Sequence, residues 1–307
     1  MSALRQAVLD YLTLRRSLGY KLKHYDRKLL DFVAHLERNG KAVITVAAAV
    51  DWASLPDRAS MRTKAIRLSV VRGFAAYVRA LEPKTEVPSP ALLPNPKQCP
   101  TPRLYTQDEI QALTGAAREL PGPLMGETYA ALIGLLAVTG MRLGEATNLD
   151  RSDINERDGL LVIRHAKFGK SREIPLHQTT VAALHAYAAK RDRVIHRPRS
   201  PSFFLSQRGT RLFKANISEV FPRLLRRIGL PDQARHRLRI HELRHTFAVR
   251  TVIEWYKSGA NVQALLPLLS TYLGHVNPSN TYWYLTGVPE LVCLAVERLE
   301  RHLGGLP

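Results

Sequence analysis

Arg142 and Glu145 lie three residues apart in the segment Thr139-Gly-Met-Arg-Leu-Gly-Glu145, where Arg142 begins a predicted helix. At this spacing the glutamate can orient the guanidinium through an ion pair. An arginine suits phosphate chemistry because its planar guanidinium stays charged and can bind two phosphate oxygens at once. Such a pair is more often an ordinary surface ion pair, so this segment indicates phosphate chemistry only in combination with other motifs.

A second group of cationic and hydrogen-bonding residues lies in the segment His241-Glu-Leu-Arg-His245. Spacings of three and four place His241, Arg244 and His245 on one face of a predicted helix. The segment also matches the His-Glu-x-x-His pattern of zinc metalloproteases. The extended form of that pattern needs a glycine and a third histidine, and this chain has Ala248 and Thr251 there. We therefore expect no metal.

Cleavage of a phosphodiester without metal needs a nucleophile, cations that hold the non-bridging oxygens, and an acid for the leaving oxygen. The two arginines could be the cations. A third segment, Leu273-Gly-His275, is followed nine residues later by Tyr284, which could be the nucleophile. The sequence thus contains the residue types that metal-free cleavage of a phosphodiester requires.

The chain contains four motifs in a fixed order: Thr-Gly-x-Arg-x-x-Glu, His-x-x-Arg-His, Leu-Gly-His and a tyrosine nine residues later. Together they resemble the ordered motifs of the tyrosine recombinase (phage integrase-like) family. The resemblance extends from Thr106 to Leu299. The segment 166–176 resembles the family's β-hairpin, whose lysine would be Lys167, although Lys170 is an alternative. The N-terminal region resembles the family's core-binding domain only in size, helicity and charge.

The resemblance implies that Tyr284 attacks the scissile phosphate while Arg142 and Arg244 hold its oxygens. The product would be a 3′-phosphotyrosyl bond that keeps the energy of the phosphodiester, so no ATP, metal or other cofactor is needed. Tyr282 competes as the nucleophile, and Tyr256 and Tyr272 are nearby; the spacing from His275 favours Tyr284.

The remaining implied roles concern protons. Lys167 would be the acid for the departing 5′ hydroxyl. His241 would assist proton transfer to and from the nucleophile, and His275 would donate a hydrogen bond to a phosphate oxygen.

The elements that must position these residues lie in a predicted catalytic domain, residues 104–307. A capping box, Thr106-Gln-Asp-Glu109, begins one helix, and a second apolar helix ends near Thr139. Strands at 160–164 and 172–176 are predicted to form a hairpin with Gly169 near its tip. Helical periodicity continues at 182–193, 213–228, 241–256 and 289–302.

The rest of the chain predicts a second domain and a linker. Apolar residues at helical spacing indicate a helical core-binding (SAM-like) DNA-binding domain at 1–82. Seven prolines mark 83–103 as a linker, and about 20 residues at ~3.1 Å each span roughly 60 Å, enough to pass around a duplex. We expect a mainly α fold with a small β-sheet or hairpin, organised as a two-domain DNA clamp.

The net charge of +19 indicates a polyanionic partner, for which double-stranded DNA is the obvious candidate. Residues 1–103 hold 18 Lys and Arg against 8 Asp and Glu, and residues 104–307 hold 27 against 18. Both parts are therefore basic. No segment has the ~20 consecutive apolar residues of a membrane span, and two cysteines give neither a disulfide framework nor a metal site. We expect a cytoplasmic, nucleoid-associated protein without a membrane partner.

The C-terminal segment 289–302 has an apolar helical stripe, Leu291, Val292, Leu294, Ala295, Val296 and Leu299. The stripe packs either on its own domain or on a neighbouring protomer, as in the four-subunit complexes on two duplexes that the resemblance implies.

Two other functions compete with a recombinase. A non-catalytic DNA-binding accessory protein would not need the full set of active-site residue types. A type IB topoisomerase-like enzyme shares the chemistry, but the short chain and separate N-terminal bundle favour a recombinase. Integration, excision, transposition and resolution remain open.

Overall fold

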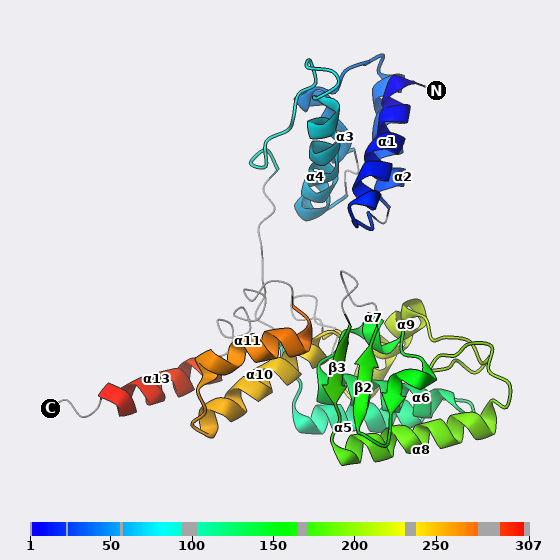
Figure 1. Cartoon of the computed structure of the whole chain (residues 1–307), viewed down its shortest axis with the longest axis vertical. Coiled ribbons are helices and arrows are strands. Elements are labelled where there is room, and N and C mark those ends of the chain that lie inside the picture. Colours follow the sequence, from blue (N-terminus) through cyan, green and yellow to red (C-terminus); the bar gives the residue numbers. More distant parts are fainter. Residues whose placement is uncertain are drawn as a thin grey trace. The chain divides into compact units, whose positions relative to one another are not determined.

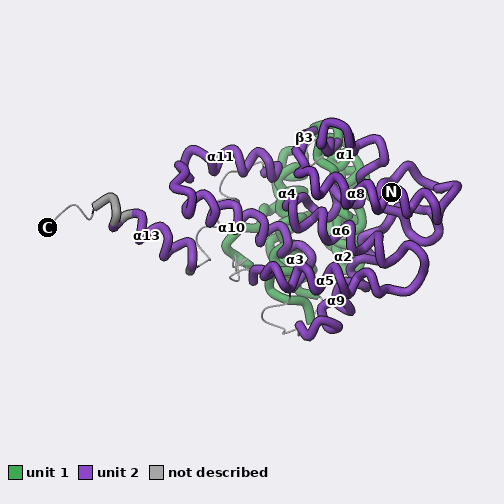
Figure 2. Tube along the Cα trace, turned by 90° about the horizontal axis from the view of Figure 1, so that it is seen from below, with its two compact units in different colours: residues 1–98 green, residues 99–307 purple. Residues whose placement is uncertain are grey.

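The chain divides into two units, residues 1–98 and 99–307 (Figure 2). The computed structural model describes residues 2–22, 24–55, 58–93, 103–164, 171–230, 238–275 and 289–303. The prediction of a mainly α chain with a small β-sheet is confirmed. No helix in these ranges is long and apolar enough to cross a membrane.

The first unit contains four helices in its described part (Figure 1): α1 (Ala3–Ser17), α2 (Tyr25–Arg38), α3 (Val46–Ser54) and α4 (Met61–Val78). Side chains of Ser2, Thr45 and Ser60 accept a backbone N–H at the start of α1, α3 and α4, which satisfies donors that have no partner inside a helix. Phe32, Trp52 and Phe74 are fully buried between the helices.

Residues 83–93, the first half of the predicted linker, lie against this unit. The amide of Glu86 donates to the carbonyl of Ile44 (2.9 Å), and its carboxylate accepts from the amide of Val46 (2.6 Å). Arg72 donates to the carbonyl of Pro88 (2.8 Å). Prolines lack an N–H but keep their carbonyl, so a proline-rich segment can still be held by side-chain donors. Residues 94–102 lie outside the described residues.

The helices of the second unit match most of the predicted ranges. Among the described residues of this unit, the helices are α5 (Gln107–Arg118), α6 (Met125–Thr139), α7 (Leu143–Ala146), α8 (Gln178–Val194), α9 (Lys214–Arg227), α10 (Glu242–Lys257), α11 (Val262–Leu273) and α13 (Pro289–Leu303). The capping box of α5 is present, and α6 ends at Thr139. Helix α11, which leads to His275, has no predicted range of its own; Pro267 lies inside it, and the helix continues through this residue.

The sheet is antiparallel, with the strand order β1 (Ile154–Asn155), β2 (Leu160–Ile163), β3 (Arg172–Pro175). Strand β2 pairs with β3 so that Leu161 faces Ile174 and Ile163 faces Arg172. The two predicted strands are therefore confirmed, and β1 adds a two-residue strand too short to show a periodic pattern. The hairpin residues 165–170 lie outside the described residues.

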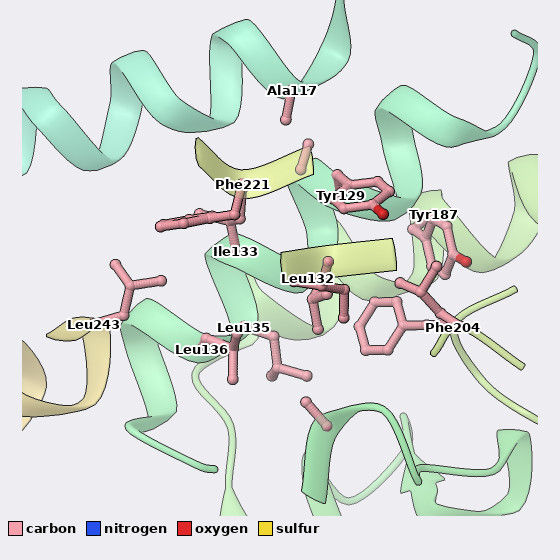
Figure 3. Close-up of a cluster of buried hydrophobic side chains, with 14 of the residues drawn as sticks. Ala117, Tyr129, Leu132, Ile133, Leu135, Leu136, Tyr187, Phe204, Phe221 and Leu243 are labelled. Carbon is pink, nitrogen blue, oxygen red and sulfur yellow. The ribbon is translucent and has the colours of Figure 1, made fainter. Parts of the chain in front are cut away.

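Helix α6 runs through the core of the second unit, with Tyr129, Leu132 and Leu136 buried along it (Figure 3). Phe204 and Tyr187 approach it from one side and Phe221 of α9 from another. A helix that is apolar on most of its faces must be buried on most of them. The C-terminal end of α6, from which the segment with Arg142 leaves, is therefore fixed by the core.

Candidate active site

Arg142 lies in a tight turn between α6 and α7. Gly140 adopts φ +59° and ends α6, and Arg142 is the N-cap residue of α7. Nη1 of Arg142 donates to Oε1 of Glu145 (2.9 Å), and the backbone amide of Arg142 donates to Oε2 (2.9 Å). The contact that the spacing of these two residues predicted is thus present. The side chain of Arg142 is 29% exposed, so its guanidinium reaches solvent.

Arg244 lies in the first turn of α10 and is only 2% exposed. Its Nη1 donates to the carbonyl of Gly140 (2.8 Å) and its Nη2 to the carbonyl of Leu273 (2.7 Å). The guanidinium therefore connects the turn that precedes Arg142 to the last residue of α11. A buried carbonyl needs a donor, and a charged donor makes a strong hydrogen bond.

The turn at Leu273-Gly-His275 joins the two arginines. Nη2 of Arg142 donates to the carbonyl of Gly274 (2.7 Å), next to the carbonyl that Arg244 binds. Gly274 has φ +68°, a conformation that favours glycine, and it ends α11. His275 follows at once, and its backbone amide closes the turn by donating to Ser270 (2.9 Å). Three motifs that are far apart in the sequence thus meet at one turn.

His275 lies among positive charges. Burial and, to a smaller extent, the charges of Arg244, Arg142 and Arg172 together lower the pKa of His275 to about 4. The ring is therefore neutral at pH 7, with one N–H that donates and one nitrogen that accepts. A neutral ring beside two guanidinium groups can donate a hydrogen bond to a phosphate oxygen without adding a further charge.

His241 and His245 lie at the start of α10 with their rings 4.9 Å apart, nearly perpendicular to each other. His241 is the N-cap residue and is exposed, whereas His245 is buried. The loss of water around part of the His241 ring lowers its pKa, as do the charges of Arg244 and Arg239. Burial and the neighbouring His241 lower the pKa of His245 to about 3. Among these three histidines, His241 is the one with open access to solvent.

Arg172 is a residue of this site that the sequence interpretation missed. It begins β3, and its guanidinium binds both carboxylate oxygens of Glu145, at 3.1 and 2.8 Å. The sequence did contain a signal, because Arg172 directly follows the hairpin segment with the candidate lysines. The spacing of Glu145 from Arg142, however, already gave the glutamate a partner. Arg172 is 27 residues from Glu145, and a pair at that separation forms no local sequence pattern.

Lys167, Tyr284 and their competitors Lys170 and Tyr282 lie outside the described residues. Of the other tyrosines, Tyr272 stacks on Phe247 (ring centroids 5.6 Å apart), and burial raises its pKa to about 12. Its phenol therefore stays protonated more firmly than an exposed one. Within the described residues, no group of three His, Cys, Asp or Glu side chains is arranged to hold a metal ion.

The sequence matches the model of the phage integrase family over residues 103–288, more than half of the chain. It is 44% identical over 308 residues to y4rB of Sinorhizobium fredii (strain NBRC 101917 / NGR234), a protein assigned provisionally as an integrase/recombinase; the match covers 98% of each chain. It is 30% identical over 298 residues to the tyrosine recombinase XerD of Mycobacterium tuberculosis, covering 91% of each chain.

Solved structures show the same fold. The XerH site-specific recombinase bound to its palindromic difH substrate superposes with a TM-score of 0.67 at 20% identity, over 93% of this chain and 79% of that one. The Tn1549 transposon integrase in complex with transposon right end DNA gives a TM-score of 0.67 at 17% identity, over 98% and 99%. The chain therefore belongs to the phage integrase family of tyrosine recombinases, enzymes that cleave and rejoin DNA.

Proposed function

We propose that this protein is a site-specific DNA recombinase that cuts each strand through a 3′-phosphotyrosyl intermediate formed by Tyr284. The oxygen of Tyr284 attacks the scissile phosphorus, the bond to the 5′ oxygen breaks, and that oxygen leaves as a hydroxyl. Rejoining reverses the step with the 5′ hydroxyl of another strand. The tyrosyl ester keeps the energy of the phosphodiester, so the reaction is balanced without ATP.

Arg142 and Arg244 hold the non-bridging oxygens in this proposal. The observation that carries it is their attachment to the neighbouring carbonyls of Gly274 and Leu273, directly before His275. That attachment fixes two positive charges and one neutral imidazole around one small volume. Fixed donors aimed at developing negative charge are the largest contribution in many enzymes, because they need no reorganisation during the reaction.

Lys167 gives its proton to the departing 5′ oxygen, and His241 exchanges the proton of the nucleophile. His241 suits the second role because its ring is exposed and its lowered pKa keeps it a neutral acceptor at pH 7. His275 donates to a phosphate oxygen. The proton of Lys167 thus passes to the DNA and that of Tyr284 to His241, whereas His275 contributes a hydrogen bond and transfers no proton.

The first test of this function is covalent capture of DNA in excess EDTA. Target sites are recovered by sequencing DNA that stays attached to the protein after denaturation, and a duplex of that sequence is nicked beside the cut. The short 5′-hydroxyl fragment then diffuses away and the adduct accumulates. We expect an SDS-resistant adduct without added metal, because side chains supply the cations. An adduct that forms only after zinc or magnesium is added would contradict the mechanism.

Both parts of the chain are basic, with a charge of +10 for residues 1–103 and +9 for residues 104–307, and we propose that they close on the duplex as a core-binding domain and a catalytic domain. Each phosphate that is neutralised adds about −0.9 to the slope of log affinity against log salt concentration. The affinity of a clamp with several phosphate contacts should therefore fall steeply as the salt concentration rises. A flat salt response in the capture assay would argue against the clamp.

Four protomers on two duplexes are proposed to assemble through α13. Leu291 is buried against α10, and Arg298 donates to the carbonyl of Ala260 (2.7 Å), so one side of α13 packs on its own unit. Val292 and Val296 are 53% and 46% exposed. The helix extends away from the rest of its unit (Figures 1 and 2). The exposed side is thus the one that a neighbouring protomer would cover.

Removal of residues 289–307 is expected to preserve binding to a single site and to abolish pairing of sites and recombination, as measured by gel shift and by a two-site recombination assay. Because this deletion also uncovers α10, the double variant Val292→Asp, Val296→Asp is the sharper test, since it changes only the exposed side. Normal recombination by that folded double variant would contradict assembly through α13.

A further inference from the structure

Arg172 is a largely buried arginine whose guanidinium binds Glu145. Its side chain is 14% exposed, and that of its partner Glu145 is 8% exposed. It begins β3, the strand that follows the 165–170 segment containing the proposed acid. Ion pairs in such a buried setting persist only when the geometry satisfies both partners well.

Glu145 is shared equally between two arginines. Oε1 accepts from Nη1 of Arg142 (2.9 Å) and Nη1 of Arg172 (3.1 Å), while Oε2 accepts from the backbone amide of Arg142 (2.9 Å) and Nη2 of Arg172 (2.8 Å). Burial raises the pKa of Glu145, but the bonds from Arg172 and Arg142 outweigh it and hold the pKa below its ordinary value. The carboxylate is therefore ionised, and its orientation is set from both sides.

Arg172 also contacts the turn that both catalytic arginines bind. A Cβ atom built on Gly274 would lie 2.7 Å from Nη1 of Arg172 and 3.3 Å from Nη1 of Arg142. The two guanidinium groups thus pass closely over the same glycine. A side chain at this position would force the guanidinium of Arg172 to shift, and the positive φ of Gly274 also favours glycine.

We propose that Arg172 is a positioning residue that fixes the guanidinium of Arg142 through Glu145, and so couples the strand after the hairpin to the arginine pair. The inference rests on the proposed recombinase function and deepens it. The side chain of Arg142 is partly exposed and has several rotatable bonds, so without a rigid Glu145 it would sample other orientations. A misplacement of about 1 Å in a catalytic group can cost about 10²-fold in rate.

Single-turnover cleavage of the nicked site duplex, measured over a range of protein concentrations, separates binding from the chemical step. We expect Arg172→Met to reduce the saturating cleavage rate by about 10²-fold with little change in the half-saturating concentration. Arg172→Lys should rescue poorly, since one ammonium cannot bind both carboxylate oxygens with the geometry of the guanidinium. Normal saturating rates in both variants would overturn the proposal.

Arg211 provides a matched control. It lies in the same unit, is also partly buried, and binds the carboxylate of Asp150 (2.5 Å) and the carbonyl of Thr147 (3.0 Å). Arg211→Met should therefore lose comparable bonds and comparable thermal stability. If its saturating cleavage rate falls as far as that of Arg172→Met, the effect of Arg172 is general destabilisation and the proposal fails.

A double-mutant cycle tests the route through Glu145. If Arg172 acts only through this carboxylate, the variant Arg172→Met with Glu145→Gln should cleave no more slowly than the slower single variant. Independent effects that multiply would mean that Arg172 acts directly on the DNA, which overturns the proposal. Each variant is first checked for a cooperative melt.

The ring of His275 provides a readout that separates charge from geometry. The positive charge of Arg172 contributes to the low pKa of His275. In NMR spectra of histidine-labelled protein, with the signal assigned by His275→Gln, Arg172→Met should therefore move the titration to higher pH. Arg172→Lys should keep it near the wild-type position yet still cleave slowly; full cleavage by this variant would show that charge alone suffices.

Failure of this inference is distinguishable from failure of the proposed function. If the wild-type protein gives no covalent adduct with any recovered site, the recombinase mechanism itself is wrong. If the wild-type protein gives the adduct and the Arg172 variants cleave at its rate, only the positioning role is wrong.

Discussion

Changing Tyr284 to phenylalanine is expected to abolish the covalent adduct while leaving duplex binding unchanged. The substitution removes only the phenolic oxygen, which is the proposed nucleophile, and keeps the aromatic ring. Cleavage should be undetectable on a denaturing gel of the nicked site duplex. A gel shift on the intact duplex should give the wild-type affinity, which shows that the loss lies in chemistry rather than in folding or binding.

The matched control for this variant is Tyr282→Phe, which should still form the adduct. Tyr272→Phe serves as a second control, since this phenol is held against Phe247 and its pKa is raised to about 12 by burial. An adduct that survives Tyr284→Phe and disappears in Tyr282→Phe would reassign the nucleophile to Tyr282.

The residues of the arginine pair could be found from the sequence because their neighbours form short local patterns. Arg142 is three residues from Glu145, and Arg244 lies between two histidines. What the sequence did not show is that the glycines of these motifs hold the arginines by their carbonyls. Gly140 and Gly274 adopt positive φ, and a Cβ on Gly140 would lie 2.4 Å from the Phe247 ring. These contacts join residues more than a hundred positions apart.

The parts of the fold for which the sequence predicted no range have local causes. Helix α11 contains Pro267, which removes one backbone donor and usually ends a helix, but here packing of Leu266 and Leu269 in the core outweighs it. Strand β1 has two residues and no period to detect. Arg172 was missed for a different reason, since its partner comes from another element and no pattern within the strand indicates it.

The structure also separates two arginines that the sequence treats alike. The side chain of Arg142 is 29% exposed and is oriented by Glu145, whereas Arg244 is 2% exposed and spans the carbonyls of Gly140 and Leu273. Replacement of Arg244 by alanine would leave two buried carbonyls without donors and would endanger the fold. Lysine is the better probe because it keeps the charge and most of the volume.

Arg244→Lys is expected to reduce the saturating cleavage rate by about 10²-fold or more, with a smaller loss of DNA binding, because fixed donors act mainly on the transition state. A single ammonium cannot span the carbonyls of Gly140 and Leu273 as the guanidinium does and still bind two phosphate oxygens. The measurement is single-turnover cleavage of the nicked site duplex, with thermal melts of each protein.

Arg250→Lys is the matched control, because Arg250 lies on the same helix and also binds two acceptors through its terminal nitrogens, the side chain of Gln107 and the carbonyl of Tyr105 (both 2.9 Å). This variant should lose similar bonds yet cleave at close to the wild-type rate. Near-normal cleavage by a folded Arg244→Lys protein would show that Arg244 only braces the two turns. The direct clamp on the phosphate would then be assigned to Arg142, whose side chain is 29% exposed.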